Sequence, residues 1–184
     1  MNAELPRIFA LFAVIIAAVA AVTDARTGKI PNWLTLPVLL IAPSLRGALS
    51  GAWPMALSLL GGLLCAIVPW GLYQMSQHAA IGGGDVKLFA ALGTLTGPAL
   101  GLEIEFASFV LLGVIAITKL TFKGMLWRLL VSTGWIMVNP FLPPRYKRVI
   151  SSDALTEMRM GPAIFLGAVL AVAVERFGGS KWFT

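Results

Sequence analysis

The sequence predicts an all-helical membrane protein, a bundle of about six transmembrane helices in one integral-membrane domain that covers residues 1–184. Of the 184 residues, 58% are apolar and only 12% are charged, whereas charged residues make up about 25% of an average soluble domain. The apolar residues form successive segments of about 20 residues, the length at which a helix crosses the hydrocarbon layer. Glycine, proline and charged residues separate these segments, which predicts short connections.

The first apolar segment runs from Leu5 to Thr23 and ends at Asp24. A helix rises about 1.5 Å per residue, so this segment can cross a thin hydrocarbon layer. A cleaved signal peptide is the alternative, because Ala18-Val19-Ala20 resembles a cleavage site and Arg7 supplies a preceding positive charge. Further apolar segments follow, so the chain would be a membrane protein in either case.

The second and third predicted spans are Trp33–Leu49 and Trp53–Tyr73. Pro31-Asn32 opens the second span. Pro54 lies in the first turn of the third span, where a missing backbone N–H costs least. Gly61-Gly62 allows a neighbouring helix to approach the third span closely.

The fourth and fifth predicted helices are Val86–Thr96, which is short, and Leu100–Leu120. Gly97-Pro98 separates them, because glycine and proline together interrupt a helix. Glu103 and Glu105 lie near the start of the fifth helix. These two acids predict that the helix enters the membrane just after them.

The last predicted span begins at Gly161-Pro162 and extends to about Val174. Between the fifth and last spans, residues 121–160 are predicted to form a cytoplasmic interfacial helix and a basic loop. A seventh span around Leu126–Val138 is the alternative, although this stretch is short for crossing a membrane.

Lysine and arginine residues predict the orientation of the bundle, because they accumulate on the cytoplasmic side of a membrane. With six spans, ten of them fall on one side and four on the other, which places both termini outside. Asp24 and Asp85 then lie on the cytoplasmic side, although neither acid was used to choose the orientation. Topology and membrane lipids thus explain the net charge of +6, and no nucleic-acid partner is predicted. The ten residues are Arg26, Lys29, Lys87, Lys119, Lys123, Arg128, Arg145, Lys147, Arg148 and Arg159.

Asp24 and Asp85 are the candidate catalytic residues, because an ionisable group at a membrane boundary loses solvation and tends to have a function or a partner. Asp85 follows three glycines and precedes an apolar helix, which also suits a helix N-cap. Asp24 has the alternative of a turn residue paired with Arg26 or Lys29. Two facing carboxyl groups cannot both ionise comfortably, so one holds a proton and the other acts as a base towards water. Helix dipoles predict that Asp85 is ionised and Asp24 protonated.

No metal site or cofactor is predicted. The chain has one cysteine, Cys65, and one histidine, His78, and it lacks the CxxC and HExxH patterns of zinc sites. Cys65 lies in an apolar segment and is predicted to be a small core residue. His78 is predicted to be a polar loop residue.

Two motifs carry a family resemblance. Asp24 stands six residues before Ile30-Pro31-Asn32, and Gly82-x-Gly84-Asp85-x-Lys87 follows two spans later. Together they resemble the type IV prepilin peptidases, which are membrane aspartyl proteases of the GxGD type. A weaker match, Met160-Gly161-Pro162-Ala163-Ile164 with Gly167, resembles the Gly-Pro-containing segment near the family's C-terminus.

The resemblance implies an aspartic endopeptidase with Asp24 and Asp85 as its catalytic pair. The implied substrates are the leader peptides of prepilins and pseudopilins, cut at the cytoplasmic boundary of the bacterial inner membrane just before a hydrophobic segment. The other implied site residues, which form the active-site loop or approach the substrate, are Gly82, Gly84, Lys87 and Pro31.

Several alternatives remain for these motifs. Gly82 and Gly84 would also suit plain turn geometry. Lys87 is two residues from Asp85 and should point elsewhere on a helix, so a lipid headgroup contact is preferred for it.

The small size of the chain resembles the peptidase-only members of tight-adherence (Flp) pilus systems, the TadV/CpaA type. Larger members carry a cysteine-rich cytoplasmic region and N-methylate the new terminus, so methyltransferase activity is not expected here. The alternative functions are an archaeal-type preflagellin peptidase, a small proton-coupled transporter and a non-catalytic assembly partner. A transporter should show an internal repeat of broken helices, and none is found.

Overall fold

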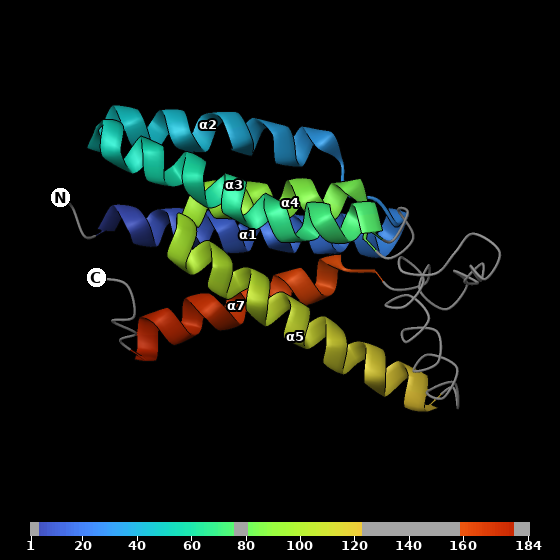
Figure 1. The fold of residues 1–184 in the computed structure, drawn as a ribbon. Coiled ribbons are helices and arrows are strands. Elements are labelled where there is room, and N and C mark those ends of the chain that lie inside the picture. Colours follow the sequence, from blue (N-terminus) through green and yellow to red (C-terminus); the bar gives the residue numbers. More distant parts are fainter. Residues whose placement is uncertain (1–3, 76–80, 123–158, 179–184) are drawn as a thin grey trace.

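The computed structural model describes residues 4–75, 81–122 and 159–178, and these residues form helices joined by short connections (Figure 1). The prediction of an all-helical bundle is confirmed for this part of the chain. The interfacial helix, basic loop or seventh span predicted within residues 121–160 falls largely on residues 123–158, outside the described ranges. The helices are α1 (Glu4–Thr27), α2 (Asn32–Ser50), α3 (Ala52–Met75), α4 (Gly83–Thr96), α5 (Pro98–Phe122) and α7 (Gly161–Gly178).

Four of these helices, α1, α2, α3 and α5, are long and apolar enough to cross a membrane. The chain is therefore a multi-pass membrane protein. The sequence predicts six spans, and α4 and α7 are not among the four. The 14 residues of α4 reach only about 21 Å at 1.5 Å per residue, so this helix is short for the hydrocarbon layer.

Two helix ends differ from the prediction in ways that matter for the site. Helix α1 continues through Asp24 to Thr27, so Asp24 lies in its last turn rather than after its end. Gly28 then stops the helix, because its φ of 67° is a left-handed conformation that favours glycine. Helix α4 begins at Gly83, three residues before the predicted start, and therefore includes Asp85.

Helix α4 is the core of the bundle and packs against α1, α2, α3 and α5. Every residue from Leu88 to Leu95 is buried. The predicted close approach at Gly61-Gly62 occurs between α3 and α4: a Cβ atom added at Gly93 of α4 would lie 2.7 Å from the backbone carbonyl carbon of Gly61. Glycines on both helices thus allow the two backbones to meet, as in other membrane bundles.

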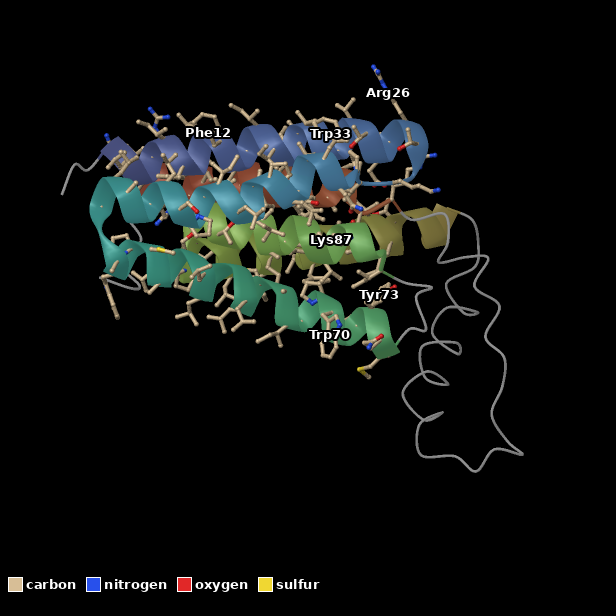
Figure 2. All side chains as sticks on the ribbon, turned by 90° about the horizontal axis from the view of Figure 1, so that it is seen from above. Phe12, Arg26, Trp33, Trp70, Tyr73 and Lys87 are labelled. Atoms are coloured by element: carbon tan, nitrogen blue, oxygen red, sulfur yellow. The ribbon has the colours of Figure 1, made fainter. Side chains whose placement is uncertain are left out.

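Small residues of α1 face the interior of the bundle, and many large apolar residues face outwards. Ala13, Ala17 and Ala20 of α1 are fully buried, whereas Phe12 and Trp70 are about half exposed and project from the outer surface (Figure 2). This distribution is typical of a bundle whose outer surface is covered by lipid. Cys65 is buried in α3, as predicted.

Glu105 is an exception to the apolar interior. The sequence predicts that Glu103 and Glu105 mark the membrane entry of the fifth helix, but Glu105 is only 4% exposed. Neither of its carboxylate oxygens has a hydrogen-bond partner among the described residues. The carboxyl group of Glu105 is therefore enclosed by the neighbouring helices.

Arg46 secures the far end of α4. Arg46 is one of the four positive residues that the predicted orientation places on the outer side, and its side chain is half-buried. Its guanidinium group donates a hydrogen bond to the Leu95 carbonyl at the C-terminal end of α4 and lies 4.7 Å from the centre of the Phe9 ring. A cation is favourable there because the C-terminal end of a helix is its negative end.

Candidate active site

Asp24 and Asp85 lie at one end of the bundle. Helix α1 runs towards this end, and α4 and α7 start from it (Figure 1). Both carboxyl groups are buried, with 6% of Asp24 and 9% of Asp85 exposed. They are close enough for the charge of Asp24 to act on Asp85. The structure thus brings together the two acids that the sequence singles out.

The Asp85 side chain is fixed by the start of its own helix. Its Oδ2 atom accepts a hydrogen bond of 3.0 Å from the Gly82 N–H, and the Asp85 N–H donates one of 3.0 Å to the Gly82 carbonyl. The contact of the Asp85 carboxylate with the Gly82 N–H is one half of a capping box, since Gly82 is the N-cap residue and has no side chain to supply the other half. The sequence considers Asp85 as the N-cap itself, whereas Gly82 holds that position and Asp85 lies three residues later. The contact with the Gly82 N–H orients the carboxyl group without removing it from the site.

Asp85 lies in the first turn of α4, outside the four candidate spans. Its pKa is raised to about 6, chiefly because burial disfavours the charged form. The Gly82 N–H lowers the pKa, while the negative charge of Asp24 raises it. The sequence predicts from the helix N-terminus that Asp85 is the ionised member of the pair; in the structure, burial acts on the pKa of Asp85 in the opposite direction.

The Asp24 side chain, which belongs to α1, is held by α7. Its Oδ2 atom accepts a hydrogen bond of 2.9 Å from the backbone N–H of Gly161, the first residue of α7. Arg26 and Lys29, the partners considered for a turn, are exposed, and Arg26 points away from the bundle (Figure 2). Asp24 therefore lies at the positive N-terminal end of α7 as well as at the negative end of α1.

Contacts of the glycine loop explain the spacing Gly-x-Gly-Asp. A Cβ atom added at Gly84 would lie 3.0 Å from the Ile30 Cβ atom, and one at Gly82 would lie 3.1 Å from Oδ2 of Asp85. A Cβ atom at Gly83 would meet only the Tyr73 ring, at an ordinary 3.9 Å. Gly82 and Gly84 thus permit close approach between atoms of the chain itself. The middle residue, Gly83, has room for a side chain.

Lys87 links α4 to the start of α2. Its Nζ atom donates a hydrogen bond of 2.9 Å to Oδ1 of Asn32, so the lipid headgroup preferred from the sequence is not its described partner. Pro31 precedes Asn32 with an extended backbone, φ −74° and ψ 142°, and its carbonyl accepts the Leu34 N–H. Pro31 therefore shapes the connection between α1, which carries Asp24, and α2, whose first residue contacts Lys87 of α4.

The segment from residue 11 to residue 117 matches the model of the type IV leader peptidase family. This match covers more than half of the chain and includes both aspartates, the glycine loop and Lys87. The chain belongs to the type IV leader peptidase family. No curated protein and no solved structure matches the chain. Membership of this family makes the protein a protease. Asp24 and Asp85 are the only two aspartates among the described residues of this leader peptidase.

Two residues of the leader peptidase site gained a role only from the structure. Asn32 was visible in the sequence as part of Ile30-Pro31-Asn32, but nothing there indicated Lys87 as its partner. Gly161 was visible as part of the Gly-Pro segment, and its contact with Asp24 spans 137 residues of sequence.

Metal ligands do not cluster in the part of the chain that the structure describes, where no group of three or more His, Cys, Asp or Glu residues could hold an ion. His78 lies outside the described residues. The side chains that gather at the site are thus the two carboxyl groups, each with a backbone N–H donor.

Proposed function

We propose that this leader peptidase is an aspartic endopeptidase that removes the leader peptides of type IV prepilins of the Flp/Tad kind and of pseudopilins. The observation that carries the proposal is the meeting of two buried carboxyl groups, Asp24 and Asp85, at one end of a membrane bundle. A buried acid pair is costly unless it does chemistry or has a partner. Aspartic proteases use such a pair to share one proton.

The proposed reaction uses one protonated and one ionised carboxyl group. The protonated group donates a hydrogen bond to the carbonyl of the scissile peptide, and the ionised group takes a proton from water as the water oxygen attacks the carbonyl carbon. A proton then passes to the leaving nitrogen as the C–N bond breaks. The raised pKa of Asp85 suits the protonated role. The N–H groups of Gly82 and Gly161 hold Oδ2 of each acid and leave Oδ1 for water or substrate.

We also propose that the site faces the cytoplasm at the bacterial inner membrane, with both termini outside. The support is the unequal distribution of lysine and arginine over the two sides of the predicted bundle. Cleavage next to the membrane suits a site at the end of the helices, where a leader can arrive from water while the following apolar segment stays in lipid.

The test is cleavage of co-expressed prepilins by the full chain and by Asp24→Asn and Asp85→Asn variants. Each substitution keeps the side-chain volume but removes the titratable proton, so cleavage should fall by at least about 1000-fold. Cys65→Ser is the control, because this buried thiol lies outside the site. A pseudopilin and an archaeal preflagellin belong in the substrate panel. Efficient cleavage by either Asn variant, with normal membrane abundance, would exclude the aspartic mechanism.

A further inference from the structure

We infer that Gly161 is a positioning residue of the peptidase site: its N–H orients the Asp24 carboxyl group, and its lack of a side chain lets α7 reach that group. The inference rests on the proposed function. Gly161 lies outside residues 11–117, so the family match says nothing about it. Helix α7 would thus complete a site whose two acids lie on α1 and α4.

The contact requires glycine. The hydrogen bond from the Gly161 N–H to Oδ2 of Asp24 is 2.9 Å long and buried. A Cβ atom added at Gly161 would lie 2.7 Å from the Asp24 Cβ atom, 2.9 Å from its Oδ2 atom and 3.1 Å from the Ala21 Cα atom. Atoms on or next to the α1 backbone cannot move aside without moving the helix, so a side chain here would displace Asp24.

The backbone at the start of α7 leaves the Gly161 N–H available as a donor. Pro162 has no N–H, and the Ile164 N–H is already bonded to the Met160 carbonyl at 3.0 Å. A helix N-terminus carries unpaired N–H groups and partial positive charge, and one of these N–H groups, that of Gly161, meets Asp24. The packing of α7 against α1 brings the two groups together.

The contact with Gly161 determines which carboxylate oxygen of Asp24 is available to water and substrate. With Oδ2 held by Gly161, the other oxygen of Asp24 keeps one direction, as the Gly82 N–H ensures for Asp85. A displaced or rotating Asp24 would be misaligned with water and peptide in most encounters. Such misalignment lowers kcat, while KM is unaffected because the substrate contacts are unchanged.

The first experiment compares four variants of the full chain in detergent, measuring kcat, KM and Tm on a leader-bearing peptide. Gly161→Ala keeps the N–H and adds a Cβ atom, whereas Gly161→Pro also removes the N–H at a helix position that tolerates proline. Gly167→Ala is the matched control on α7, because its Cβ atom would press on the Ser108 backbone, 2.7 Å from the nitrogen, and not on Asp24. Gly113→Ala is the neutral control, with no atom within 4 Å.

We expect Gly161→Ala to lower kcat by about 100-fold or more with KM within about twofold, and Gly161→Pro to lower kcat further. Gly167→Ala should lower Tm but keep the kcat of the folded fraction within about threefold of wild type. The inference is overturned if Gly161→Ala keeps wild-type kcat, or if Gly167→Ala loses as much kcat as Gly161→Ala.

A cross-link tests the contact between Gly161 and Asp24 with a readout that does not depend on kcat. The pair Asp24→Cys with Gly161→Cys, made in a Cys65→Ser background, should form a disulfide on oxidation in membranes, because bridged Cβ atoms lie only about 3.8 Å apart. The pair Asp24→Cys with Gly113→Cys should not. A wild-type chain that cleaves no leader would overturn the proposed function. A cleaving wild type without the cross-link would overturn only the role of Gly161.

Discussion

The glycine loop gives the sharpest test of how backbone contact controls the site, through the change Gly84→Ala. The added Cβ atom would lie 3.0 Å from the Ile30 Cβ atom and 3.3 Å from the Ile30 carbonyl oxygen. Carbon atoms pack at about 3.5–4.0 Å, so the first turn of α4 must retreat by roughly 0.5–1 Å. Asp85, the next residue, moves with it. We expect a loss of about 100-fold in kcat and of roughly 1–3 kcal/mol in the free energy of unfolding.

Gly83→Ala is the matched control, one residue away in the same turn. Its Cβ atom would meet only the Tyr73 ring at 3.9 Å, which is ordinary contact. Because glycine is a poor helix residue, alanine at position 83 should stabilise the start of α4 by about 0.5–1 kcal/mol. Cleavage by Gly83→Ala should therefore equal that of wild type.

The assay is the rate of leader cleavage by purified protein in detergent, at saturating and at low substrate, together with Tm. The two variants differ by one position and share the same added methyl group, so general effects of composition cancel. Equal activity of the two alanine variants would refute the reasoning, because the difference rests entirely on the distance to Ile30.

Two further predictions concern the charged groups near the site. Lys87→Met and Asn32→Leu should each lower the free energy of unfolding by about 1 kcal/mol, because each removes the hydrogen bond between the two side chains. The double variant should lose no more than either single variant, because both substitutions remove the same bond. Additive losses, or a raised KM for Lys87→Met only, would instead indicate that Lys87 contacts the substrate. The pKa of Asp85 is raised to about 6, so its proton is kept below that pH and lost as pH rises through it. If Asp85 is the proton donor, kcat/KM should fall on the alkaline side with a midpoint near pH 6, and a rate that keeps rising through this range would assign the donor role elsewhere.

The sequence alone determined the class of the protein and the identity of the candidate acids. Apolar segments of nearly constant length lead to a helical membrane bundle, because lipid leaves the backbone no partner except itself. The starts of α2 and α3 were predicted to within one residue, and the last helix was predicted to begin at Gly161 as it does. Asp24 and Asp85 stood out because charge is rare in such segments.

The tertiary structure alone decided how these acids are held and which residues assist them. Gly161 reaches Asp24 across 137 residues, and Lys87 reaches Asn32 across 55. Such contacts depend on how helices cross, which no local pattern encodes. The raised pKa of Asp85 and the enclosure of Glu105 have the same origin, because burial is set by all neighbouring helices together. Local sequence places a carboxyl group on a helix, but the surrounding bundle determines how far the group is exposed, which hydrogen-bond partner it has and how readily it is protonated.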